Sequence, residues 1–158
     1  MLTQEEKQQI EAEFERYPHK QAACIEALKL IQQHHGWVSD EHLKDVAEFL
    51  DMTAEELENV ATFYNIIFRQ PVGEHVIRMC DSVSCWIMGY ERLREFITRN
   101  LKIEMGETTQ DSQFTMVPIQ CLGVCEQAPA LMVDDDLYTS LSLDNLEQVL
   151  QTYRKEQG

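Results

Sequence analysis

The most informative segment for the fold of the second half reads Phe114-Thr-Met-Val-Pro-Ile-Gln-Cys-Leu-Gly-Val-Cys125. Residues 114–120 predict a strand that runs directly into Cys121. Gly123 follows, and its backbone freedom allows a sharp turn before Cys125 that aims N–H groups at sulfur. The segment therefore predicts a strand that ends in two cysteines held on a tight loop.

A similar arrangement lies upstream, where residues 75–79 predict a strand that runs into Cys80. The two cysteine pairs have the spacings Cys80-x4-Cys85 and Cys121-x3-Cys125. If the two strands are neighbours, both pairs lie at the same edge of one sheet, and loops at strand ends are where functional residues concentrate. The pattern therefore predicts one site built from both pairs.

The remaining pattern of the second half predicts a small layered α/β or α+β domain. Helical periodicity extends from about Gly89 to Leu101, and Ser142 is placed to cap a last helix. Residues 130–133 predict a third strand and residues 137–140 a fourth, with the aspartates of 134–136 as the turn between them.

The first part of the chain carries a helical pattern instead. Capping boxes, each a threonine followed three residues later by a glutamate, mark helix starts at Thr3 and Thr53. Further helices are predicted over residues 20–35 and after Ser39. Four helices with short connections suggest a small bundle.

The pattern changes at residues 70–73, Gln-Pro-Val-Gly, a turn-like stretch. We therefore expect an α+β chain with two domains. Residues 1–70 form a helical domain, which we expect to serve docking because all four paired cysteines lie after the turn. Residues 73–158 form the domain that holds them.

Composition narrows the class of function. The chain has 158 residues and a net charge of −15, with 13 basic against 28 acidic side chains, which argues against a nucleic-acid binder. Its first residues are acidic and polar rather than the basic and apolar regions of a signal peptide, and no apolar run is long enough to span a bilayer. The sequence predicts a cytoplasmic protein that reaches a membrane only through partners.

The paired cysteines predict a metal centre. Four thiolates at one place repel one another unless a cation neutralises them, and both zinc and an iron–sulfur cluster do so. The open x4 and x3 loops favour the larger 2Fe–2S cluster, although zinc sites with C-x4-C spacing occur. Cys24, the fifth cysteine, lies on the apolar face of a predicted helix and is expected to be a core residue.

No catalytic residues are predicted. The sequence contains neither a Gly-rich nucleotide loop nor a nucleophile–base constellation, so the chain alone is not expected to bind NADH or flavin. A thiol oxidoreductase is disfavoured because no C-x-x-C pair supplies attacking and resolving thiols. A zinc-stabilised interaction module without a redox role remains the alternative.

A longer motif carries a family resemblance. Asp111-x2-Phe114-Thr115-x5-Cys121-Leu-Gly-Val-Cys125-x2-Ala128-Pro129 resembles, at every fixed position, the signature of the E subunit of bacterial NADH:quinone oxidoreductase, respiratory complex I. The stretches at residues 60–64, 68–73 and 80–85 are also similar to that subunit family.

The resemblance implies a helical N-terminal domain followed by a thioredoxin-like ferredoxin domain. It implies one 2Fe–2S cluster on Cys80, Cys85, Cys121 and Cys125, and a partner flavoprotein, the F subunit, that binds FMN and NADH. It also implies other peripheral-arm subunits, on the cytoplasmic side of the inner membrane. Similar subunits occur in NAD-linked hydrogenases and formate dehydrogenases, which stay open as parent complexes.

Overall fold

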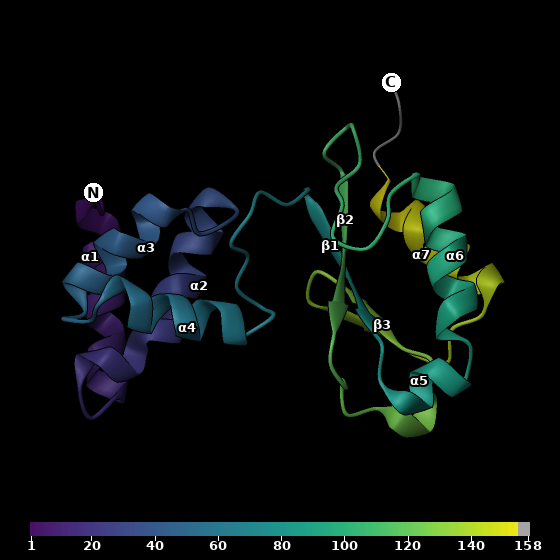
Figure 1. Cartoon of the computed structure of the whole chain (residues 1–158), viewed down its shortest axis with the longest axis horizontal. Helices are drawn as coiled ribbons and strands as arrows, with labels where there is room; N and C mark the ends of the chain where they lie inside the picture. The colour runs from purple at the N-terminus through teal and green to yellow at the C-terminus, as the bar shows by residue number, and fades with distance from the viewer. Residues whose placement is uncertain (155–158) are drawn as a thin grey trace. The chain divides into compact units, whose positions relative to one another are not determined.

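The computed structural model describes residues 1–154 and separates the chain into two compact units, Met1–Pro71 and Val72–Gly158. In Figure 1 the first unit runs from purple through blue to teal and consists of helices, whereas the second contains the sheet. The division falls at the turn where the sequence pattern changes. No helix among the described residues has the length and apolar character needed to cross a membrane.

The first unit is built from four α-helices, α1 (Gln4–Glu13), α2 (Cys24–His35), α3 (Asp40–Phe49) and α4 (Ala54–Phe63). Both predicted capping boxes form, and Ser39 caps α3. The helix predicted from Lys20 is α-helical only from Cys24, because Lys20–Ala23 forms a 3₁₀ turn whose N-cap residue, His19, makes no side-chain cap. The chain also turns through a short 3₁₀ segment at Phe14–Arg16.

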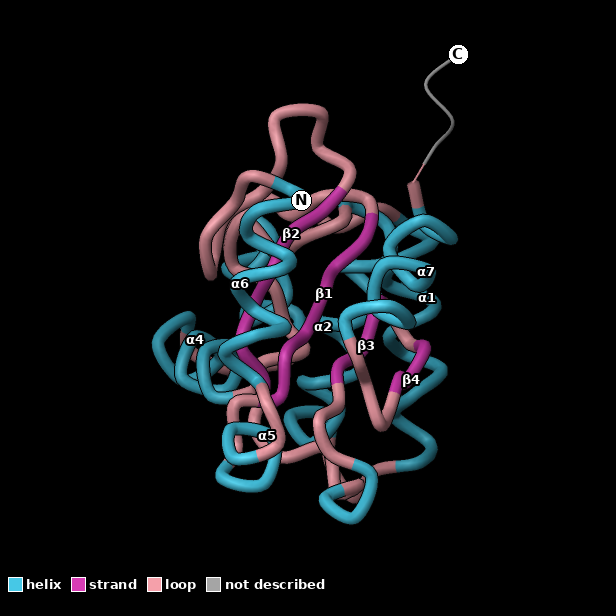
Figure 2. Tube along the Cα trace, turned by 90° about the vertical axis from the view of Figure 1, so that its right-hand side faces the viewer, coloured by secondary structure: helices cyan, strands magenta, loops and turns pink. Residues whose placement is uncertain are grey.

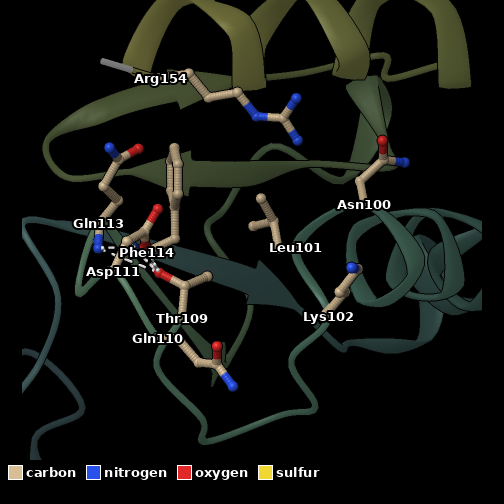
Figure 3. Close-up of a pocket in the computed structure, with 9 residues that line it drawn as sticks. All are labelled: Asn100, Leu101, Lys102, Thr109, Gln110, Asp111, Gln113, Phe114 and Arg154. Carbon is tan, nitrogen blue, oxygen red and sulfur yellow. Dashed lines mark hydrogen bonds between the residues drawn. The ribbon is translucent and has the colours of Figure 1, made fainter. Parts of the chain in front are cut away.

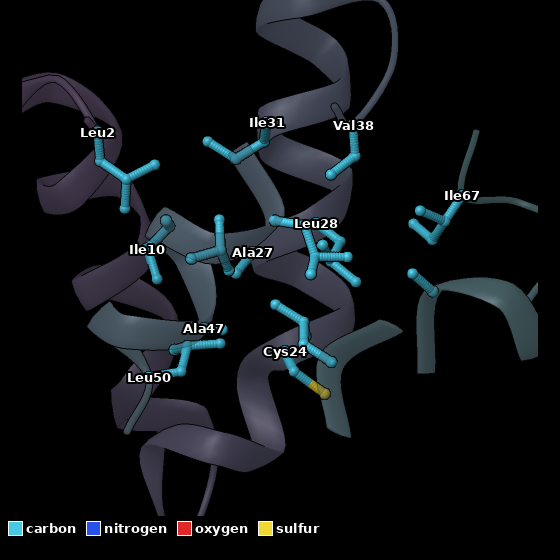
Figure 4. Packing of buried hydrophobic residues seen from close by; sticks show 14 residues of the cluster. Leu2, Ile10, Cys24, Ala27, Leu28, Ile31, Val38, Ala47, Leu50 and Ile67 are labelled. Atoms are coloured by element: carbon cyan, nitrogen blue, oxygen red, sulfur yellow. The ribbon is translucent and has the colours of Figure 1, made fainter. Parts of the chain in front are cut away.

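The core of this unit forms around the apolar face of α2, where Leu28 and Ile31 are fully buried. Figure 4 shows Cys24 among these side chains, and its 9% exposure confirms the predicted core position. The apolar pattern of the helix that starts at Thr53 also predicts a buried Tyr64, and this prediction is wrong. Helix α4 ends at Phe63, the backbone becomes extended at Tyr64, and 40% of that residue is exposed.

The second unit contains a mixed four-stranded sheet in the order β2-β1-β3-β4. Its strands are β1 (His75–Cys80), β2 (Phe114–Ile119), β3 (Leu131–Val133) and β4 (Asp136–Tyr138). Strand β1 pairs in parallel with β2 and antiparallel with β3. The expectation that the two cysteine-bearing strands are neighbours is therefore confirmed, as is the α+β class.

Helices complete this unit: α5 (Val83–Ile87) and α6 (Tyr90–Leu101) lie between β1 and β2, and α7 (Leu143–Tyr153) follows β4. Figures 1 and 2 show α6 and α7 on the same face of the sheet. Leu93 and Ile97 of α6 and Leu146 of α7 are buried in the core between these helices and the sheet.

Gly73 fixes how the chain enters β1. A Cβ atom at this position would lie 2.9 Å from the backbone nitrogen of Phe114, a distance that a side chain cannot occupy. The Gly73 N–H donates a hydrogen bond of 2.6 Å to the Thr115 hydroxyl. Glycine therefore lets the segment before β1 lie directly against the start of β2, which supports the parallel register.

Two predicted segments differ from the structure. Helix α5 falls where a loop was expected, because five residues are too few to show a helical period. The strand predicted over residues 137–140 begins at Asp136 instead and ends at Tyr138, since Asp136 pairs with Val133 across a tighter turn.

Candidate metal centre

The parallel pairing of β1 and β2 brings both cysteine pairs to one end of the sheet. Cys80 is the last residue of β1 and lies opposite Ile119, the last residue of β2, so Cys121 follows only two residues beyond. Figure 1 shows α5, which carries Cys85, next to the green segment that follows β2. The shared position is a consequence of strand direction, because parallel strands end at the same edge.

The first pair lies inside the protein. Cys80 and Cys85 are 2% and 3% exposed, and they pack with Ala128 and Ala130. The Cys80 N–H donates to the Ala130 carbonyl at 3.3 Å, which ties this pair to the segment before β3.

The second pair is exposed. The Cys121 and Cys125 sulfurs are 3.3 Å apart, and all five cysteines of the chain are free thiols. The Gly123 N–H donates to the Cys121 sulfur at 3.3 Å, and Gly123 has a φ of +79°, a conformation that favours glycine. The loop therefore has the predicted form, with a backbone N–H aimed at sulfur.

In each pair, the pKa of one thiol is lowered and the pKa of the other is raised. Burial opposes ionisation of Cys80, but hydrogen bonds from the Ser82 and Leu122 N–H groups outweigh it, and the pKa of Cys80 is lowered. Burial raises the pKa of Cys85 to about 11, with a further contribution from Cys80.

In the second pair, the Gly123 N–H lowers the pKa of Cys121, and the hydrogen bond and charge of Cys121 in turn raise the pKa of Cys125. In each pair, ionisation of one thiol therefore opposes ionisation of the other. A bound cation removes this conflict, so the donor set fits a metal centre.

The four thiols are near one another without forming a closed cage. Cys80 acts on the pKa of Cys121 and Cys125, and Cys125 acts on Cys85, so the two pairs share one electrostatic environment. Within residues 1–154, no group of three or more histidine, cysteine or carboxylate side chains is already placed to hold a metal ion. The assignment of Cys80, Cys85, Cys121 and Cys125 as ligands stays a prediction.

A separate cavity lies elsewhere in the second unit (Figure 3). Its volume is about 780 Å³. At its wall, the Asp111 carboxylate accepts hydrogen bonds from the Thr109 hydroxyl at 2.5 Å and the Gln113 N–H at 3.0 Å. Its lining includes no cysteine and comes from Asn100, Leu101, Lys102, Thr109, Gln110, Asp111, Gln113, Phe114 and Arg154. Asp111, part of the motif noted in the sequence, therefore holds the turn before β2 and does not belong to the cysteine site.

Solved structures of other proteins share the fold of this chain. The chain resembles an NAD+-reducing [NiFe]-hydrogenase in the air-oxidised state, with a TM-score of 0.67 and 20% identity. The similarity covers 80% of this chain but only 22% of the hydrogenase chain. The same values hold for the H2-reduced state. At this identity the likeness concerns fold alone.

Curated relatives are closer in sequence. The E subunit of NADH-quinone oxidoreductase from Pseudomonas aeruginosa is 45% identical over 153 residues, which cover 97% of this chain and 92% of the relative. The proteins of the same name from Buchnera aphidicola and Escherichia coli K12 are each 43% identical over 97% of this chain, and the matches cover 94% and 92% of those relatives.

The family model of the thioredoxin-like [2Fe-2S] ferredoxins matches residues 10–154. This range contains both cysteine pairs and most of both units. The resemblance inferred from the motif is thereby confirmed. The chain belongs to the thioredoxin-like [2Fe-2S] ferredoxin family.

Proposed function

We propose that this chain is the electron-transfer subunit of an NADH:quinone oxidoreductase and holds one 2Fe–2S cluster on Cys80, Cys85, Cys121 and Cys125. A partner flavoprotein, the F subunit, would bind NADH and FMN and exchange single electrons with this chain. The observation that carries the proposal is the meeting of two cysteine pairs at one end of adjacent parallel strands, in a chain of a 2Fe–2S family.

When bound, the cluster supplies a one-electron redox centre. The two cysteine pairs hold the cluster from different sides. Cys80 and Cys85 provide sulfur from a buried side that excludes water, whereas Cys121 and Cys125 provide it from the exposed side, where a partner can approach. The Gly123 N–H orients the Cys121 sulfur and stabilises its negative charge.

The parent complex follows from sequence similarity. Relatives named as the E subunit of NADH-quinone oxidoreductase are 43% to 45% identical, against 20% for the hydrogenase, so these identities favour the quinone-linked complex over a hydrogenase. Within that complex we place the chain among other peripheral-arm subunits on the cytoplasmic face of the inner membrane, with the membrane reached only through them.

The decisive experiment is a metal analysis of anaerobically purified protein, with EPR after dithionite reduction. We expect iron and acid-labile sulfide in the 2Fe–2S ratio, no stoichiometric zinc, and the signal of a reduced cluster. Stoichiometric zinc in an iron-replete preparation would favour the zinc-stabilised module instead. Reduction of the cluster by NADH should require the flavoprotein partner.

A truncated chain tests the division of labour between the units. We propose that residues 1–70 serve mainly docking and that residues 73–158 hold the cluster. A chain that begins near Pro71 should reconstitute the cluster but bind the flavoprotein about tenfold or more weakly. Unchanged affinity of the truncated chain in a binding titration would contradict the docking role, and loss of its cluster would contradict the independence of the second unit.

Asp81 tests how local charge affects the potential. Reduction adds a negative charge, so a nearby carboxylate opposes it. A unit charge ~7 Å away at an effective dielectric of ~20 is worth roughly 2.4 kcal/mol, which is about 100 mV for one electron. Asp81 is exposed, and screening reduces the effect to tens of millivolts. Asp81→Asn should therefore raise the potential, more at low salt than at high salt.

An EPR-monitored redox titration at two salt concentrations measures this shift. Asp135→Asn is the matched control, because Asp135 is also exposed but follows β3 at its far end from Cys80. A shift of the same size in both variants, or no upward shift for Asp81→Asn, would mean that hydrogen bonds and burial set the potential.

A further inference from the structure

The cavity at the start of β2 is not used by the proposed function. Its volume is about 780 Å³, within the range of about 300–1,000 Å³ for small-molecule sites. Phe114, the first residue of β2, belongs to its wall, whereas Cys121 follows the other end of this strand. Six strand residues span roughly 20 Å, so the cavity and the cysteine site lie at opposite ends of the sheet.

Two cationic side chains reach this cavity from the ends of two helices. Lys102 follows α6, where its N–H donates to the Thr98 carbonyl at 2.8 Å. Arg154 follows α7, where its N–H donates to the Leu150 carbonyl at 3.2 Å. Figure 3 shows the Arg154 guanidinium and the Lys102 ammonium turned toward the same open space. The hydrogen bonds of the helix ends therefore fix the backbone of both residues before any ligand binds.

The backbone conformation of Lys102 is unusual for a lysine. Its φ is +57°, in the left-handed region, where a side chain crowds the backbone and where helices usually end on glycine or asparagine. Strained backbone of this kind is concentrated at functional sites. The charge of Lys102 is thus held at the cavity in spite of a conformational cost.

Positive charge outweighs negative charge on the cavity wall. Among residues 1–154, neither Lys102 nor Arg154 forms an ion pair. Asp111 is the one carboxylate of the described lining. The hydrogen bond from Thr109 lowers the pKa of Asp111 most, and the charge of Arg154 lowers it further. Two cations therefore face one carboxylate, in a chain whose net charge is −15.

We propose that this cavity binds a small organic polyanion, whose phosphate or carboxylate groups pair with Arg154 and Lys102. The planar guanidinium of Arg154 matches two oxygens of either group, and the Lys102 ammonium adds a point charge. The amide side chains of Gln110 and Gln113 supply further hydrogen-bonding groups at the wall. A divalent cation is disfavoured, because it needs several oxygen ligands and two basic side chains repel it.

Isothermal titration calorimetry of the full-length chain with its cluster tests the proposal, with inorganic pyrophosphate and citrate as separate probes at low salt. Arg154→Gln and Lys102→Gln each remove one positive charge. Each should weaken binding about tenfold or more, which corresponds to the loss of one hydrogen bond to a charged group. Arg92→Gln is the matched control and should bind like the unmodified chain. Arg92 is also exposed and lies in the first turn of α6, at the far end of this helix from Lys102.

Asp111→Asn should change the affinity in the opposite direction. Asparagine keeps a side-chain oxygen that can accept the hydrogen bonds from Thr109 and Gln113, but it removes a negative charge that repels an anion. The variant should therefore bind the probes more tightly than the unmodified chain. Weaker binding in Asp111→Asn would contradict an anion site.

The two probes distinguish the chemistry of the ligand. Tighter binding of pyrophosphate would support phosphate groups, and tighter binding of citrate would support carboxylates. Failure of both probes to bind at millimolar concentration, or equal weakening in Arg92→Gln, would overturn the proposal. A lower midpoint of thermal unfolding that accounts for the lost binding in Arg154→Gln and Lys102→Gln would also overturn it, because these residues would then only stabilise their helix ends.

Discussion

Cys121→Ala is expected to abolish or scramble the cluster, whereas Cys24→Ala should leave the iron content unchanged. The two cysteines differ in surroundings. Cys121 is exposed on a loop with a second sulfur 3.3 Å away and an N–H aimed at its own sulfur. Cys24 is surrounded by the aliphatic core of the helical unit, where burial raises the pKa of its thiol.

Iron and sulfide content, visible absorbance and the EPR signal of the reduced protein measure this difference. Cys24→Ala removes one buried sulfur, so its cost should appear as a loss of about 1 kcal/mol in the stability of the first unit. Cys125→Ala should behave like Cys121→Ala, because the two thiols share a loop. If Cys24→Ala lost iron while Cys121→Ala kept it, the proposed ligand set would be wrong.

Acid should destabilise the helical unit through Glu6, which is only 3% exposed. Burial raises the pKa of its carboxyl, but hydrogen bonds from the Thr3 N–H at 2.7 Å, from His35 at 2.7 Å and from the Thr3 hydroxyl at 2.9 Å outweigh this cost. The pKa falls from 4.5 to about 2.

A carboxyl whose pKa is lowered by folding stabilises the folded state above its unfolded pKa. The stabilisation should therefore be complete above pH 4.5 and should disappear as the pH falls toward 2. At about 1.4 kcal/mol per pKa unit, the contribution is about 3 kcal/mol, or roughly a hundredfold in the unfolding equilibrium.

Glu6→Gln should remove most of this pH dependence, and Glu56→Gln is the matched control. Both glutamates complete a capping box that glutamine can also form, but Glu56 is exposed. In a Trp86→Phe background, Trp37 is the remaining tryptophan and its fluorescence reports urea unfolding of the first unit. Equal losses in both variants at neutral pH would show that the cap, and not the buried charge, stabilises the helix.

Much of the fold could be predicted from local patterns. Capping at Thr3, Ser39, Thr53 and Ser142 marked helix starts correctly, because each cap depends on residues within one turn. The strands before Cys80 and Cys121 were also recognisable, because each is marked by a short apolar run of its own residues. Element ends were less well predicted, as at Lys20 and Tyr64, since packing and capping decide where a helix begins and ends.

Some features of the cysteine site could likewise be predicted from the sequence, and others could not. The spacing of the cysteine pairs and the glycine between Cys121 and Cys125 indicated a metal centre without any structure. The exposure of Trp86, Ile87 and Met88 could not be predicted, because these side chains have the composition of a core segment. Only the position of α5 at the end of the sheet, with Cys85 turned inward, shows which side of this segment is open.

The family, the helical and mixed halves, and the two cysteine pairs could all be recognised from the sequence, since these features depend on neighbours along the chain. Contacts between residues far apart in the sequence were visible only in the folded chain. Folding placed β1 beside β2, through the close approach of Gly73 to Phe114, and so brought the two pairs together. It also set His35 against Glu6, 29 residues away, because only a packed interior brings such groups within hydrogen-bonding distance and removes competing water.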